Sequence, residues 1–231
     1  MRGSPHIGIL REKPLHAALK EWCRQPGDLV EHPVDGFVID VVRGDLLIEI
    51  QTNGFAGMKR KIATLVAGGH PIRIVHPIAV DRTIVRIEDD GTIVGRRLSP
   101  KHGAVVDIFS QLVSFPDLVV DFDLEIVVVL TVEDEYRVHS PGRAWRRKGW
   151  IVEERRLKGV VGSLTLASGS DLLALLPANL PEPFTTSDLA ASLGRRMRVA
   201  QQMAYCLRET GLIEKSGKRG NAIEYRIARN G

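Results

Sequence analysis

Two short apolar stretches lie on either side of Arg43-Gly44-Asp45. Residues 37–42 and 46–50 are rich in β-branched and aliphatic side chains, the pattern of two strands joined by a tight turn. If Arg43 and Gly44 form the turn, Asp40 is a diagonal neighbour of Glu49 across the two strands. The pattern therefore predicts a β-hairpin with two acidic side chains close together.

The predicted hairpin has one apolar face and one face with polar groups, because alternate residues of a strand share a face. The apolar face consists of Phe37, Ile39, Val41, Leu46, Ile48 and Ile50. The other face carries Asp40, Glu49 and Gln51, so two carboxylates and an amide converge. Asp35 falls on the apolar side in this register and ranks behind Asp40 as a candidate site residue.

The segments around the hairpin alternate between helical and extended patterns. Apolar residues recur at helical spacing from Pro14 to Trp22, and Glu12 lies at the entry to this helix, with His16 one turn later on the same side. The further predicted elements are a strand at 28–32, ended by Pro33, a helix at 55–66 and a strand at 70–77. The order helix, strand, hairpin, helix, strand predicts an α/β (α+β) fold in which helices cover a mixed sheet.

The middle of the chain is rich in strand patterns. We expect a second hairpin (83–87 and 92–97), a helix (103–112) and strands at 124–132 and 149–155. The cluster from Arg143 to Trp150 interleaves tryptophans with Arg146, Arg147 and Lys148. These side chains could stack on bases and hold a phosphate backbone, or the tryptophans could pack inward while the charges are solvated.

The composition changes after the proline-rich segment 177–183, which is the predicted domain boundary. Helices are expected at 189–194 and 197–209, followed by two strands around a basic tip at 216–221. The last 50 or so residues resemble a winged helix-turn-helix domain. That resemblance implies DNA contacts by residues of the second helix and of the wing: Arg195, Arg198, Gln201, Gln202, Lys218 and Arg219. The alternative is a winged helix that binds protein.

The length of 231 residues fits three parts: a core at 1–80, an extension of that core at 81–176 and a terminal domain at 177–231. No apolar run approaches the ~20 residues that cross a bilayer, and no signal peptide is evident, so we expect a cytoplasmic protein without membrane contact. Cys23 and Cys206 are far apart, which disfavours a zinc site or a disulfide scaffold.

The net charge of +4 belongs to the terminal part of the chain. Residues 178–231 carry nine Lys or Arg and five Asp or Glu, and the remaining residues carry 23 of each sign. A basic terminal module indicates an anionic partner such as DNA.

Residues 8–78 resemble the core of the PD-(D/E)XK nuclease superfamily, because acids and lysines occupy matching elements in the same order. The resemblance implies a restriction-endonuclease-like core in which Asp40 and Glu49 ligate Mg²⁺ or Mn²⁺. Glu12 would be a third ligand, and Ile50 would add its carbonyl oxygen. Gln51 stands where lysine is usual, so Lys59 or Lys61 of the next helix would have to assist the attacking water. The whole chain also resembles a prokaryotic family of unknown function.

These features give three hypotheses. The first is a metal-dependent DNA endonuclease, a homodimer if it cuts both strands, with DNA held by the winged helix and the Arg143–Trp150 cluster. The second is a DNA-binding regulator with a degenerate nuclease-like core, which Gln51 favours. The third is an assembly protein whose winged helix binds another subunit.

Overall fold

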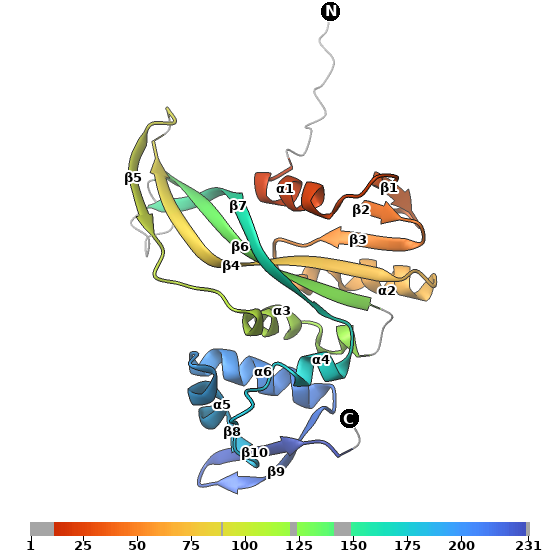
Figure 1. Ribbon diagram of the computed structural model, residues 1–231, viewed down its shortest axis with the longest axis vertical. Coiled ribbons are helices and arrows are strands. Elements are labelled where there is room, and N and C mark those ends of the chain that lie inside the picture. The colour runs from red at the N-terminus through yellow and green to blue at the C-terminus, as the bar shows by residue number, and fades with distance from the viewer. Residues whose placement is uncertain (1–11, 89, 121–123, 141–148, 230–231) are drawn as a thin grey trace, which may run out of the picture.

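The computed structural model describes residues 12–88, 90–120, 124–140 and 149–229 (Figure 1). The first half contains α1 (Pro14–Cys23), β1 (Leu29–Val34), β2 (Phe37–Arg43), β3 (Leu46–Ile50), the 3₁₀ turn η1 (Phe55–Met58), α2 (Lys59–Ala67), β4 (Ile72–Ile87) and β5 (Ile93–Leu98). The second half contains η2 (Val105–Ile108), α3 (Phe109–Leu112), η3 (Pro116–Val119), β6 (Leu124–His139), β7 (Trp150–Leu166), α4 (Gly169–Leu173), β8 (Phe184–Thr185), α5 (Thr186–Leu193), α6 (Met197–Glu209), β9 (Ile213–Arg219) and β10 (Ala222–Ile227).

The larger sheet is mixed and has the strand order β1-β2-β3-β4-β6-β7, with β5 paired to β4. β1, β2 and β3 form an antiparallel meander, whereas β3, β4 and β6 run parallel to one another. The order helix, strand, hairpin, helix, strand and the mixed α/β class are both confirmed. β1 continues through Pro33 because it lies at the edge of the sheet, where the missing N–H is tolerated.

The two faces of the sheet are covered by different helices. α1 and α2 lie on opposite sides of β3 (Figure 1). Leu19 of α1 packs with Val41 and Ile48 in one buried cluster, whereas Ile62 of α2 packs with Ile39 in the main core. The prediction of one continuous apolar face was therefore wrong, because Ile39 and Val41 belong to different cores on either side of Asp40.

β4 is one strand of 16 residues, although two separate strands were predicted in this range. Pro77 does not end β4, because β3 pairs with β4 only as far as Ile50↔Val75. Pro77 lies beyond that last pair, so its missing N–H removes no hydrogen bond to β3. β6 and β7 are also longer than predicted, at 16 and 17 residues, and pair with each other over most of that length. The predicted β4–β5 hairpin is confirmed, with Ile87 paired to Ile93. The helix predicted at 103–112 begins later, at η2, and ends with α3.

The C-terminal segment contains the predicted two helices and hairpin, and α6 begins and ends at the predicted residues. The Thr185 side chain accepts a hydrogen bond from the Asp188 N–H at the start of α5, and Gly194 ends that helix with φ +60°. α6 also packs against α3, where Cys206 Sγ lies 3.8 Å from the Phe109 carbonyl oxygen. This segment therefore shares the main apolar core. Over the described ranges, no helix combines the length and hydropathy needed to span a bilayer.

Candidate active site

Asp40 and Glu49 meet where β2 and β3 separate. The last pair of the two strands is Val41↔Ile48, and the next step of this register places Asp40 opposite Glu49. In place of a further main-chain bond, the Ile50 N–H donates to Asp40 Oδ2 at 2.7 Å. The Asp40 carboxylate thus accepts the hydrogen bond of the Ile50 N–H at the point where the two strands separate.

The predicted hairpin register was wrong by one step in the turn. Arg43 pairs with Leu46, so the turn residues are Gly44 and Asp45, and Gly44 adopts φ +55°. Glycine accepts this left-handed conformation without strain, which favours a turn that starts at Gly44. The correction places Asp40 directly opposite Glu49 instead of diagonal to it.

Lys61 of α2 contacts Glu49 on one side of the opening. Its Nζ lies 2.5 Å from Glu49 Oε1 and donates to the Val38 carbonyl oxygen at 2.7 Å. Burial raises the pKa of Glu49, the Lys61 ammonium opposes that rise, and the charge of Asp40 adds to it. Of the two lysines considered, Lys61 reaches the acids, whereas Lys59 Nζ lies over the ring of Phe115, 5.5 Å from its centroid.

The other side of the opening is occupied by the start of α1. His16 Nδ1 lies 2.6 Å from Glu12 Oε1, and His16 Nε2 lies 3.3 Å from Asp40 Oδ2. Lys20 Nζ lies 2.7 Å from carboxylate oxygens of both Glu12 and Glu31. The expected proximity of Glu12 and His16 is thus confirmed, and His16 joins the acid before α1 to the acid on β2.

The pKa values of this group follow from its pairing. The hydrogen bond to Asp40 raises the pKa of His16 against the effect of burial, and Glu12 adds to the rise. Burial alone would raise the pKa of Asp40, but the bonds from His16 and the Ile50 N–H bring it below its ordinary value. Burial would likewise raise the pKa of Glu12, which Lys20 and His16 lower. Each acid of the site therefore has a cationic partner.

We expect this pairing to make stability fall as pH rises above the ordinary histidine pKa of 6.5. Because the folded-state pKa of His16 is raised above 6.5, its contribution is complete below that value and is lost as pH rises through the folded pKa. In His16→Asn, the free energy of unfolding should lack this loss, which we expect to be on the order of 1 kcal/mol. Urea unfolding without divalent cations, from about pH 6 to about pH 8.5, measures it. His102→Asn leaves His16 in place and should follow the parent; a His16→Asn curve parallel to the parent would contradict the assignment.

The side chains of Gln51 and Asp35 form hydrogen bonds to residues other than Asp40 and Glu49. Gln51 Nε2 donates to the Gly54 carbonyl oxygen at 2.7 Å. The main-chain carbonyl oxygen of Gln51 lies 2.6 Å from His76 Nδ1. Asp35 was expected on the apolar face, but it lies in the β1–β2 turn with φ +47°, half exposed, and its Oδ2 is 2.9 Å from His70 Nε2. Its place in a turn removes it from the alternation of strand faces, so that expectation was wrong.

The donor set was tested for a divalent cation. Among the described residues, no group of three or more His, Cys, Asp or Glu side chains is arranged to hold a metal ion. Mg²⁺ commonly binds through one or two carboxylates and fills the other positions with water and substrate phosphate. Asp40 and Glu49 fit this mode, since the contacts to Ile50, His16 and Lys61 engage only one oxygen of each carboxylate.

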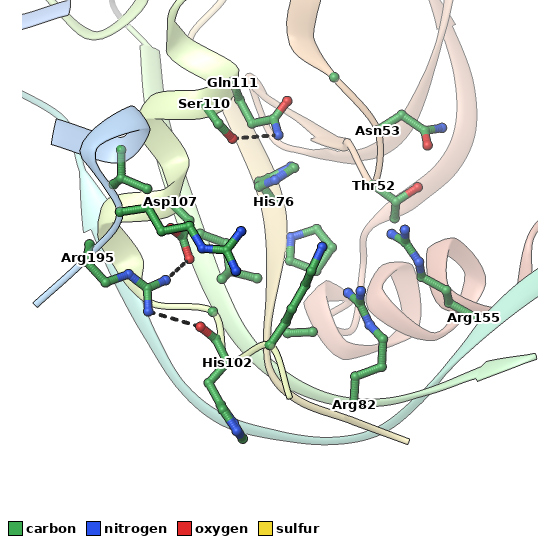
Figure 2. Close-up of a pocket in the computed structure, with 18 of the residues that line it drawn as sticks. Thr52, Asn53, His76, Arg82, His102, Asp107, Ser110, Gln111, Arg155 and Arg195 are labelled. Atoms are coloured by element: carbon green, nitrogen blue, oxygen red, sulfur yellow. Dashed lines mark hydrogen bonds and ion pairs between the residues drawn. The ribbon is translucent and has the colours of Figure 1, made fainter. Parts of the chain in front are cut away.

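A polar pocket of about 710 Å³ lies beyond the end of β3 and reaches the start of α6 (Figure 2). Thr52 and Asn53, which follow β3, line one part of it, and Arg195 lines another. Arg195 donates to the His102 carbonyl oxygen at 3.0 Å and forms an ion pair with Asp107. Burial lowers the pKa of His76 to about 4, so this residue of the pocket wall is neutral.

The other residues predicted to bind DNA have different surroundings. Arg198 and Gln201 are exposed on α6 and Gln202 is half-buried, while Lys218 is exposed on β9. Arg219 is paired with Asp188 and Glu224. Arg146, Arg147 and Lys148 lie outside the described residues; Trp150, the end of their cluster, is half-buried beneath Arg86, whose guanidinium lies 5.0 Å from the ring centroid.

The candidate site lies almost wholly within a segment shared with other proteins. The family model described as "Domain of unknown function (DUF8091)" matches residues 13–167, from α1 to the end of β7. A protein of Treponema pallidum (strain Nichols), described as an uncharacterized protein, is 30% identical over 223 residues, which cover 95% of this chain and 87% of the relative. No solved structure gives a significant match to the chain.

Proposed function

The chain belongs to the DUF8091 family, and on this premise we propose that it is a metal-dependent nuclease that hydrolyses phosphodiester bonds of DNA. One observation carries the proposal: Asp40, Glu49 and Lys61 converge where β2 and β3 separate. Two carboxylates and an ammonium group, brought together from a hairpin and the helix after it, suit the cleavage of a phosphate ester. The element order at residues 8–78, which resembles the PD-(D/E)XK nucleases, supports the same proposal.

In this proposal the chain's own residues divide the work. Asp40 and Glu49 hold Mg²⁺ or Mn²⁺, with Glu12 and the Ile50 carbonyl oxygen as further candidate ligands. The bound ion supplies a Lewis acid that polarises the phosphodiester and lowers the pKa of a water molecule. Lys61 has three N–H donors, of which two are used by Val38 and Glu49. Among the described residues nothing accepts from the third N–H, which could orient the attacking water or stabilise negative charge on a phosphate oxygen.

DNA binding and location are parts of the same proposal. The C-terminal segment resembles a winged helix, and the exposed positions of Arg198, Gln201 and Lys218 support its use on DNA. Cutting both strands of a duplex takes two such sites, so a homodimer is the form proposed for duplex cleavage. A DNA substrate places the activity in the cytoplasm, away from membranes.

A second candidate function is DNA binding without cleavage. Gln51 favours it, because an amide takes the place of a lysine and donates to Gly54 instead of reaching the acids. In that case Lys61 serves only to neutralise the buried Glu49.

The test is a cleavage assay with supercoiled plasmid and circular single-stranded DNA in Mg²⁺ or Mn²⁺. We expect nicked, linear or shortened products, and we expect EDTA to abolish them. DNA binding without products in either metal would contradict the nuclease and support the second candidate. The variants argued in the Discussion separate intrinsic activity from a contaminating nuclease.

A further inference from the structure

The pocket beside the candidate site carries an excess of positive charge. Five of its lining residues are basic: Arg82, Lys101, Arg155, Arg195 and Arg196. The acid among the described lining residues, Asp107, is paired with Arg195. The buried Glu133 pairs with Arg82, and the buried Glu135 pairs with both Arg82 and Arg155, so the excess positive charge is carried by Lys101 and Arg196. Like charges that converge around a hollow repel one another, so an anion that enters the pocket is favoured.

Several of these cations keep donors that the chain does not use. Within the described ranges, Lys101 and Arg196 have no ion-pair partner, and both are exposed. The Nε atoms of Arg82 and Arg155 are buried without a hydrogen-bond partner among the described residues, although Arg155 Nε lies 3.5 Å from Glu135 Oε2. In Figure 2 the guanidinium groups of Arg82 and Arg155 point into the pocket from the side opposite Arg195. The exposed donors of Lys101 and Arg196 indicate a ligand rich in acceptors, whereas the two buried Nε atoms are not accessible to one.

The outline of the hollow indicates an extended ligand. A smaller pocket of about 220 Å³ shares Thr52, Asn53 and Arg155 with the large one and reaches Lys13, next to Glu12. The two pockets are therefore neighbours, and together they make up a path from the start of α1, past the end of β3, to the start of α6. The smaller pocket is also lined by Glu153 and Glu154, so the excess of positive charge belongs to the large pocket. Uncharged donors and acceptors also line it, among them Ser110 and Gln111, which suit sugar and base edges.

We propose that this path holds the phosphate backbone of a nucleic-acid strand, and that the large pocket binds phosphates next to the segment that lies at Asp40 and Glu49. The identity of the ligand as nucleic acid rests on the proposed nuclease function. A nucleotide or inorganic phosphate offers the same chemistry in a compact form. Two neighbouring pockets that extend from α1 to α6 favour the strand.

The test measures binding of the full chain to a fluorescent single-stranded oligonucleotide by anisotropy, in EDTA so that no cleavage occurs. The Lys101→Ala/Arg196→Ala variant should bind at least about 10-fold more weakly. The slope of log K against log salt should fall by about 1.4, since each phosphate contact on a single strand contributes about 0.7. The matched control is Arg96→Ala/Lys158→Ala, which removes the same charge from exposed residues outside the pocket and should bind like the parent.

Three outcomes decide the matter. Parental affinity and salt slope in Lys101→Ala/Arg196→Ala would overturn the pocket assignment. ATP or pyrophosphate that displaces the oligonucleotide, together with affinity that does not grow with oligonucleotide length, would overturn the strand and assign a compact phosphate ligand. Binding that depends on Lys101 and Arg196 without any cleavage in Mg²⁺ supports the pocket and contradicts the nuclease proposal alone.

Discussion

Replacement of Glu49 with glutamine is expected to lower DNA cleavage by at least about 10³-fold. Glutamine keeps the shape of the side chain but removes the negative charge that a divalent cation needs. Lewis-acid catalysis by a bound metal contributes several kcal/mol, and each 1.36 kcal/mol is tenfold in rate. Initial rates of plasmid nicking in Mg²⁺ measure the effect, and Asp40→Asn should show a loss of similar size because it removes the opposite carboxylate.

The control for this prediction is Glu21→Gln, which removes one exposed carboxylate that pairs with Arg24 and should cleave like the parent. Because Glu49 is buried against Lys61, the unfolding of Glu49→Gln is measured as well, so that lost activity is not confused with lost fold. Parental cleavage by both folded variants, Glu49→Gln and Asp40→Asn, would exclude a metal site at this position.

The sequence predicted those features of the site that depend on local periodicity. Strand alternation placed Asp40 and Glu49 close together, and that proximity is confirmed, because the charge of Asp40 acts on the pKa of Glu49. The shared face is not confirmed, because Asp40 is bonded by His16 of α1 and Glu49 by Lys61 of α2, and these helices lie on opposite sides of β3 (Figure 1). Helical spacing placed Glu12 beside His16. Local patterns could not predict which of Lys59 and Lys61 contacts the acids, because that depends on the orientation of α2 on the sheet.

The parts that the sequence did not predict arise from contacts between distant segments. A buried strand was expected at 124–132, yet β6 continues to His139, with Glu133 and Glu135 paired to Arg82 of β4. The basic pocket likewise joins residues from β4, β7, the segment before η2 and the start of α6. No spacing along the chain marks such a set. Arg195 illustrates the consequence, since a residue expected to contact DNA from the helix surface lines this pocket.

Cationic side chains of the chain itself offset the acids that lie together where β2 and β3 separate. His16 offsets Asp40, Lys61 offsets Glu49, and Lys20 offsets Glu12. A divalent cation that binds both carboxylates takes over the first two of these roles. The binding of a metal would then free Lys61 to act on water or phosphate. A substitution of Lys61 therefore tests whether this lysine contributes to catalysis or only neutralises Glu49.

Lys61→Met is expected to lower kcat for cleavage by about 10² to 10³-fold, the usual cost of losing one preorganised donor to a developing charge. KM for DNA should change little, since one half-buried ammonium adds little to the capture of a long polyanion. Lys59→Met is the matched control: it lies two residues earlier on the same helix, removes the same charge and should keep kcat within about twofold. Cleavage kinetics of both variants measure the difference. Equal losses in the two would show that general charge on α2 matters and that Lys61 has no role of its own, whereas full activity in Lys61→Met would leave Asp40 and Glu49 without a lysine partner in catalysis.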